Sequence, residues 1–149
     1  MASAAAYDAF SARLTTAWTS PKPGLVFENE FAQQYLDAGL PFVYVEIYGD
    51  SFNQETLGAP GNNQWKEEGA TYLHVMTAAG TGSRQARVWA NDLLNLFREQ
   101  PIVTDVLTGE ALFMPEMSIG AGSPGQDFPN YYAMTATIQW RRREYTNLP

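Results

Sequence analysis

The sequence predicts an α+β fold, with one mixed, largely antiparallel sheet and two main helices packed on it. Three observations support this prediction. Apolar residues recur every three or four positions in two segments, apolar and polar residues alternate in several others, and clusters of glycine and proline separate the segments. The predicted order is α-β-β-α-β-β, in a single domain over residues 1–149.

The first predicted helix covers about residues 4–18, because its apolar side chains fall on one face. Two prolines and a glycine in residues 19–24 end this helix. A short extended piece is expected at residues 25–27, and residues 29–40 are interpreted as a polar connection.

Residues 41–52 have the clearest strand pattern, with Val43, Val45 and Ile47 on one face. The other face mixes large aromatic residues with acidic ones, which is typical of contact surfaces. Its residues are Tyr44, Glu46, Tyr48, Asp50 and Phe52. The alternative is that the first helix covers this face, and the sequence does not decide between the two. A loop at residues 58–64 leads into the partner strand.

A strand, a glycine turn and an amphipathic helix follow within residues 65–100. The turn contains Gly80 and Gly82, and Ser83 is expected to cap the helix. Backbone N–H groups at such a helix start can hold a phosphate. However, Gln85 stands where a dinucleotide site needs its third glycine, and no lysine follows the turn. A tight turn with a serine cap is therefore the favoured interpretation.

Two further strands are predicted at residues 111–117 and 131–145, separated by the loop Ser118–Asn130. This loop and the loop at residues 58–64 are long and rich in glycine. The hydrophobic residues that border them are Trp65, Ile119 and Phe128. Loops of this kind often carry recognition, so we expect both to contact a partner.

The composition excludes several classes of protein. The chain has no cysteine, which rules out disulfides and thiolate metal sites, and no apolar run of about 18 residues that could cross a membrane. Asp8 and Arg13 interrupt the apolar N-terminal stretch, which therefore does not read as a signal peptide. A formal net charge of −7 argues against general nucleic-acid binding.

The single histidine, His74, lies in the middle of a predicted strand, and Glu46 or Asp50 on the neighbouring strand are candidate partners. A catalytic histidine needs a nucleophile and an orienting carboxylate, and a zinc site needs further ligands. Glu67 and Glu68 are adjacent, so they point to opposite faces of a strand and form no carboxylate pair. We therefore expect no enzyme activity, no metal and no cofactor, and a structural or interface hydrogen bond for His74.

Charge is distributed unevenly along the chain. Residues 28–68 hold eight acidic side chains against Lys66 alone, whereas Arg141, Arg142 and Arg143 form a basic block near the C-terminus. This asymmetry suits a protein that meets copies of itself head to tail through arginine–carboxylate contacts. The alternative, that both regions are simply solvated, is the commoner situation for surface charge.

Three segments within residues 7–145 stand out together with the order of elements: the hairpin "GNNQWKEEG", the turn and helix "GTGSRQARVWANDLLNLF", and the polar end of the last strand. In these features the chain resembles the tail terminator proteins of long-tailed (siphovirus-like) phages and gene transfer agents. The resemblance implies a small α+β subunit that forms a ring, expected to be a homohexamer. Such a ring caps the tail tube, stops its polymerisation and joins it to the head-completion proteins. It implies no cofactor and no catalytic residue.

On this resemblance the protein is expected to be a structural virion protein at the head–tail junction, assembled in the host cytoplasm. Its expected partners are its own copies, the tail tube protein and a head-completion (stopper) protein, and DNA passes the ring without specific binding. The residues expected at the subunit interface are Arg141, Arg142, Arg143, Tyr44, Glu46 and Tyr48. Those expected along the lumen are Glu55, Glu67 and Glu68. The alternatives are another neck or tail-tube subunit of the same particle, or a small phosphate-ligand-binding protein or enzyme that uses residues 80–83.

Overall fold

The computed structural model describes residues 3–19, 21–105, 109–120, 122–124, 128 and 130–146. Its helices are α1 (Ala4–Ala17), α2 (Gln33–Ala38) and α3 (Arg84–Asn95). Its strands are β1 (Gly24–Phe27), β2 (Phe42–Gln54), β3 (Gln64–Ala78), β4 (Ile102–Asp105), β5 (Glu110–Ile119), β6 (Ser123–Pro124) and β7 (Tyr131–Tyr145).

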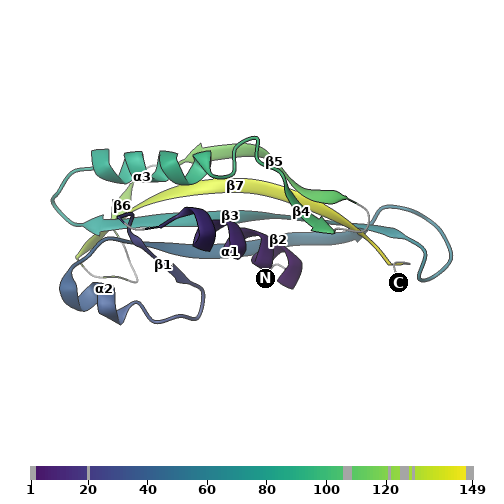
Figure 1. Cartoon of the computed structure of the whole chain (residues 1–149), viewed down its shortest axis with the longest axis horizontal. Coiled ribbons are helices and arrows are strands. Elements are labelled where there is room, and N and C mark those ends of the chain that lie inside the picture. Colours follow the sequence, from purple (N-terminus) through teal and green to yellow (C-terminus); the bar gives the residue numbers. More distant parts are fainter. Residues whose placement is uncertain are drawn as a thin grey trace.

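All of these strands belong to one sheet, in the order β1-β2-β3-β7-β5-β4, with β6 paired to β7 beside this path. The β1–β2 pair is parallel and the other pairs are antiparallel. The predicted fold class, a mixed and largely antiparallel sheet with helices, is confirmed. Figure 1 shows the long strands β2, β3 and β7 running along the length of the molecule.

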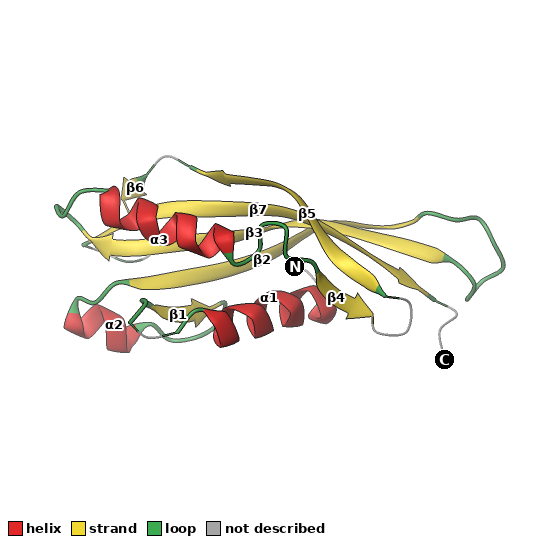
Figure 2. Ribbon diagram, turned by 45° about the horizontal axis from the view of Figure 1, so that its top comes forward, coloured by secondary structure: helices red, strands yellow, loops and turns green. Residues whose placement is uncertain are grey.

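The helices α1 and α3 lie on the same face of the sheet, as Figure 2 shows. In the main core, Phe10 of α1 and Leu93 of α3 are fully buried together with Val43 of β2. The rings of Phe10 and Phe97 have centroids 5.3 Å apart, so α1 also packs against the turn that follows α3. Because α1 covers the Val43 side of β2, the alternative that the first helix lies over Tyr44 is wrong.

The short helix α2 covers one end of the opposite face. Its Tyr35 stacks on Phe42 with ring centroids 5.6 Å apart, and Phe42 is fully buried beside Met76 in a second, smaller core. The interpretation of residues 29–40 as a connection is therefore wrong. The signal for α2 is weak because the helix has only six residues and its N-cap residue, Ala32, makes no side-chain cap bond.

A β-bulge in β2 changes which residues share a face. The pairing with β3 shifts between Gly49 and Ser51, and one extra residue in a strand reverses the facing of all the residues after it. Phe52 consequently points to the same side as α1, with its ring centroid 5.7 Å from that of Trp65. The prediction that Phe52 shares a face with Tyr48 is wrong, since a bulge leaves no clear mark in the hydrophobic pattern.

The glycine turn before α3 adopts the predicted conformation but not the predicted cap. Gly80 and Gly82 have φ angles of +86° and +82°, which favour glycine, so the tight-turn interpretation fits the backbone. Ser83 precedes the first helical residue, but its side chain caps no N–H group of α3. The Ser83 Oγ instead accepts a hydrogen bond from Nε of Arg87 at 3.3 Å.

Candidate functional site

The face of the sheet opposite α1 and α3 carries a row of aromatic and polar side chains across three strands. We call this set the tyrosine face: Tyr44, Glu46 and Tyr48 of β2, Tyr72 and His74 of β3, and Thr135 and Thr137 of β7. The register makes Tyr44, His74 and Thr135 direct cross-strand neighbours, although Tyr44 and Thr135 are far apart in sequence. Three neighbouring strands therefore present these side chains on one surface.

Glu46 is the centre of the hydrogen bonds on the tyrosine face. One carboxylate oxygen accepts from the Tyr48 hydroxyl at 2.6 Å, and the other contacts Nε2 of His74 at 2.5 Å. The second ring nitrogen, Nδ1 of His74, lies 2.7 Å from the Thr135 hydroxyl. An ionised carboxylate only accepts, so Nε2 donates. Nδ1 then accepts from the threonine when the ring is neutral and donates to it when the ring is charged.

The rings of this face are also packed against one another. The His74 ring lies between those of Tyr44 and Tyr72, at centroid distances of 6.0 and 6.2 Å, and both contacts are stacked. Tyr48 meets Tyr72 edge to face at 5.5 Å. The hydrogen bond to Glu46, followed by burial and the charge of that carboxylate, raises the pKa of Tyr48 from 10.0 to about 12. Tyr48 therefore stays a neutral hydrogen-bond donor throughout the physiological range.

The hydrogen bonds connect a hydroxyl (Thr135), an imidazole (His74) and a carboxylate (Glu46) in the same order as the nucleophile, base and acid of a catalytic triad. Acyl transfer also needs unpaired N–H donors for the developing oxyanion. Thr135 lies inside a central strand, where the β3 ladder occupies one side and Gly120 donates to its carbonyl at 2.9 Å on the other. A central strand leaves its backbone donors engaged. Thr135 therefore lies among paired backbone groups, and the two hydrogen bonds of His74 connect β2, β3 and β7. A structural or interface role for His74 stays a prediction.

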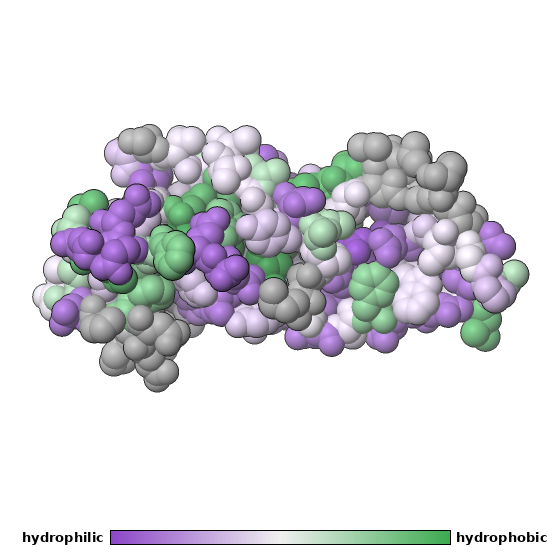
Figure 3. All heavy atoms as spheres, turned by 90° about the horizontal axis from the view of Figure 1, so that it is seen from below, coloured by the Kyte–Doolittle hydropathy of each residue, from purple (hydrophilic) through white to green (hydrophobic). Residues whose placement is uncertain are grey.

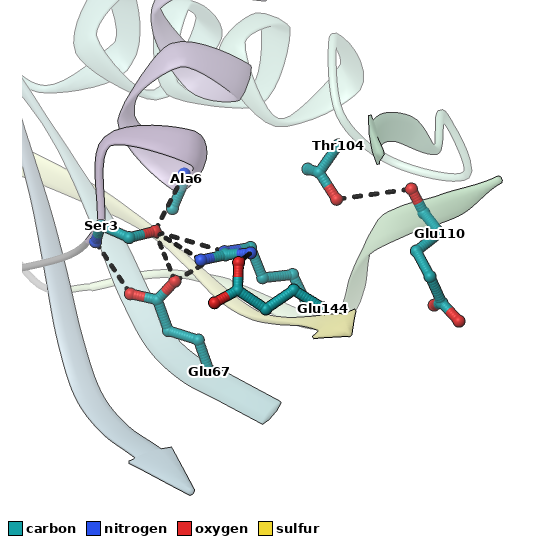
Figure 4. Close-up of polar contacts among 7 residues, drawn as sticks. Ser3, Ala6, Glu67, Thr104, Glu110 and Glu144 are labelled. Carbon is teal, nitrogen blue, oxygen red and sulfur yellow. Dashed lines mark hydrogen bonds and ion pairs between the residues drawn. The ribbon is translucent and has the colours of Figure 1, made fainter. Parts of the chain in front are cut away.

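The three arginines of the basic block have three different environments. Arg142 is buried, and its Nε donates to Glu67 at 2.6 Å, while the Ser3 Oγ donates to the same carboxylate at 2.6 Å. Figure 4 shows Ser3 at the start of α1 together with Glu67 and Glu144 from the strands. The expectations of an interface role for Arg142 and a lumen role for Glu67 are therefore wrong. Successive side chains on a strand point to opposite faces, so Arg142 points into the core while Arg141 and Arg143 point away from it.

The two outer arginines remain accessible on the same side as the tyrosine face. The guanidinium of Arg141 lies over the ring of Phe113, 4.5 Å from its centroid, and its Nε has no hydrogen-bond partner among the described residues. Nε of Arg143 donates to Glu55 at 2.8 Å, and both side chains are partly exposed. An interface role for Arg141 and Arg143 stays a prediction.

The two remaining lumen candidates are already paired within the chain. Glu68 forms an ion pair with Lys66 at 2.8 Å, and the hydrogen bond and charge of this lysine lower the pKa of Glu68. Glu55 pairs with Arg143, as described above. Both carboxylates are thereby partly neutralised, and their place along a lumen stays a prediction.

The loop between β2 and β3 is held in shape by Asn63. This residue is buried, its amide donates to the carbonyl of Ala59 at 3.0 Å, and its backbone N–H donates to Thr146 at 2.9 Å. The side chain of Leu57 in the same loop is fully exposed. A partner role for this loop and for the neighbouring Trp65 stays a prediction.

The second predicted partner loop, Ser118–Asn130, lies in part outside the described residues. Ile119 is exposed at the end of β5. Phe128 meets Phe42 and Tyr44 edge to face, at ring centroid distances of 5.0 and 5.6 Å. It packs on the smaller core and is half-buried, so only part of its side chain is available to a partner.

Within the described part of the chain, no group of three or more acidic or histidine side chains is arranged to hold a metal ion. No described helix combines the length and the apolar character needed to span a membrane. Seen from below, hydrophobic residues lie among hydrophilic ones along the molecule, so this surface is mixed in character (Figure 3).

Comparison with known proteins gives one informative result, and it concerns the fold. No family model and no curated protein matches the sequence. A solved structure known only by a sequence identifier, one of 29 matching chains, superimposes with a TM-score of 0.64 at 19% identity. The match covers 97% of this chain and 98% of that one. The same architecture therefore occurs over the full length of another protein, and at this identity the likeness shows the fold alone.

Proposed function

We propose that this protein is a ring-forming tail terminator: a structural subunit that assembles with its own copies, caps a phage-type tail tube and joins it to the head-completion proteins. One observation carries the proposal. The sheet is covered by α1 and α3 on one face, while the opposite face presents the hydrogen-bonded tyrosine face. Large aromatic side chains in a rigid arrangement on an open sheet are what a protein contact surface requires.

The sequence resemblance to tail terminators supplies the type of assembly. Two further features agree with a structural role. The hydrogen bonds of His74 are satisfied by Glu46 and Thr135 without a ligand, and Glu55 and Glu68 pair with basic residues of the same chain. These contacts fix side chains in place and leave the surface ready for association.

The proposal is tested by mass photometry and negative-stain electron microscopy of the purified protein over a range of concentrations. We expect one closed ring with a single narrow mass, six times that of the 16.5 kDa chain if the ring is a hexamer. Open tubes of varying length would favour the tail-tube alternative. A monomer at every concentration, both alone and when added to purified tail tubes, would contradict the proposal.

A further inference from the structure

Two stretches of strand in this sheet have no neighbouring strand on their outer side within the described residues. The strand β1 pairs with β2 only as far as Val45, and the N–H of Ile47 is taken by Glu28, which leaves residues 48–54. At the other side of the sheet, β4 pairs with β5 only as far as Leu112, which leaves residues 113–119. We call these stretches the β2 edge and the β5 edge. In Figure 2, β5 lies along the outer boundary of the sheet.

The two edges overlap in height along the sheet. The register connects Tyr48 of β2 through Ala70 and Gln139 to Glu116 of β5. It likewise connects Ser51 through Glu68 and Arg141 to Phe113. The two edges therefore share the rows between these two connections, and from there the β2 edge continues toward Gln54 while the β5 edge continues the other way toward Ile119. Copies set side by side without a large axial shift would bring the shared rows of the two edges opposite each other.

The irregularities of the two edges also match. The register shift in β2 falls between Gly49 and Ser51, and the register shift in β5 falls between Phe113 and Glu116. Both lie between the same two rows of the sheet. Because a bulge increases the local twist of its strand, both edges bend at the same height. Two strands that bend at one level can stay in contact across the bend.

Exposed hydrophobic side chains are concentrated on these edges. Of the eight large hydrophobic residues that are exposed in the described part, four belong to the β2 and β5 edges: Tyr48, Phe52, Phe113 and Ile119. Monomeric proteins usually protect free edges with charged residues, proline or a covering segment. Pro115 and Glu116 protect only the middle of the β5 edge. The apolar residues around them fit a strand that is covered in the assembled state.

Strand direction agrees with a head-to-tail arrangement. Three antiparallel pairings separate β2 from β5, so the two strands run in opposite directions. In a cyclic ring all copies have the same orientation. The β2 edge of one copy and the β5 edge of its neighbour would consequently meet as an antiparallel pair, which is the same geometry as inside the sheet.

We propose that copies of this protein join by pairing the β2 edge of one chain with the β5 edge of the next, giving a sheet that is continuous around the ring. This inference rests on the proposed ring and adds the surfaces that form it. Backbone hydrogen bonds supply the pairing, as they do when a strand is added to any exposed sheet edge. The exposed aromatic residues and the matched bulges select the register.

Cysteine cross-linking tests the pairing directly, since the natural chain has no cysteine. The double variant Tyr48→Cys/Glu116→Cys places thiols on both edges in one row and on one face. Within a chain these positions are three strand spacings apart, about 14 Å, whereas a disulfide needs Cα atoms within about 7 Å. Any disulfide in this variant must therefore join two chains. A second pair, Tyr48→Cys/Ser118→Cys, covers a small axial shift.

After mild oxidation, a non-reducing gel should show a ladder up to the ring size for at least one double variant and only monomer for each single variant. Reduction should collapse the ladder. A covalent dimer with Tyr48→Cys alone would instead indicate a two-fold β2–β2 contact and overturn the proposal. Unchanged circular dichroism and melting temperature would confirm that the variants are folded.

An edge-blocking variant with a matched control completes the test. Tyr48→Lys keeps a donor near Glu46 but places a charge on the β2 edge, and we expect it to lose the ring. Phe31→Lys changes a residue that is 95% exposed but lies on neither edge, and should keep the ring. Suppose that the wild type forms rings, that neither double variant gives a ladder, and that Tyr48→Lys still assembles. This result would overturn the edge pairing and leave the tail-terminator proposal standing. Absence of rings in the wild type, both alone and with purified tail tubes, would overturn both.

Discussion

At the scale of single residues, the contact between Glu67 and Arg142 is the most buried ion pair among the described residues. Both side chains are only 4% exposed. The same carboxylate also accepts from the backbone N–H of Ser3 at 2.8 Å, while the Ser3 side chain caps α1. One ion pair thus connects the start of the first helix to the long strands β3 and β7.

Replacing Arg142 with methionine should destabilise the protein strongly. The variant leaves the Glu67 carboxylate buried without its cation, and breaking such a pair costs roughly 3–5 kcal/mol. Arg143→Met is the matched control, because its ion pair with Glu55 is partly exposed and pairs of that kind contribute about 1 kcal/mol or less. Urea unfolding of the two variants measures the difference. Equal losses of unfolding free energy would show that the Glu67–Arg142 contact is unimportant for stability.

Tyr48 should titrate later than an ordinary tyrosine. Its pKa is raised from 10.0 to about 12, so the folded state holds this proton while the unfolded chain releases it above pH 10. The contribution to stability is complete below pH 10 and is lost as the pH rises through about 12. Absorbance of tyrosinate near 295 nm follows this step, which Tyr48→Phe should remove.

The variant Glu46→Gln is the control for this titration, because it removes the carboxylate that raises the pKa and keeps a similar shape. Its Tyr48 step should move back toward pH 10. A titration that is unchanged in Glu46→Gln would mean that burial alone, and not the hydrogen bond, sets the pKa of Tyr48.

At the scale of elements, the bulge in β2 depends on a glycine in the neighbouring strand. A Cβ atom at Gly69 would lie 2.0 Å from the carbonyl oxygen of Tyr48 and 2.6 Å from Cζ2 of Trp140. The backbone oxygen cannot move away without breaking the sheet at this point. Trp140 is itself buried in the main core next to Phe10, with ring centroids 6.1 Å apart.

Gly69→Ala should therefore lower the free energy of unfolding by at least the 1–3 kcal/mol that is typical of overpacking in a core. Gly120→Ala is the matched control, since the nearest atom to an added Cβ there is a carbonyl oxygen at the ordinary contact distance of 3.7 Å. Thermal unfolding of both variants compares the two sites. Similar melting temperatures for the two variants would contradict a close approach of β2 and Trp140 at Gly69.

The elements that could be predicted from sequence are those with long periodic patterns. The first helix was expected at residues 4–18 and spans Ala4–Ala17, and the last strand matches residues 131–145. The elements α2 and β4, of six and four residues, are too short to show a period and are missing from the predicted order. The change in the face to which Phe52 points could not be predicted from sequence, because it depends on one bulge in the pairing of β2 with β3.

The candidate site was predictable only in part, for a similar reason. Glu46 was a candidate partner of His74 because the two lie on successive strands of a hairpin, where the register is local. Thr135 is 61 residues away from His74, and only the pairing of β3 with β7 brings them together. The burial of Arg142 was within reach of the sequence, since alternation along a strand turns it away from Arg141 and Arg143.

At the scale of the whole molecule, the charge distribution argues against binding to DNA. The net charge is −7, and the outer arginine Arg143 is engaged by Glu55. We expect no shift of duplex DNA by micromolar protein in a gel titration at low salt, where electrostatic attraction is strongest. Micromolar affinity that weakens steeply with added salt would contradict this prediction and indicate that Arg141 is available to phosphates.

The one-sided helix layer also makes each subunit a wedge. The helices α1 and α3 thicken the molecule on one face of the sheet, whereas among the described helices only the short α2 covers part of the opposite face. Wedges joined edge to edge produce a curved assembly, and six copies share a full turn in steps of about 60°. The bulk of the helix layer would then set the curvature of the ring.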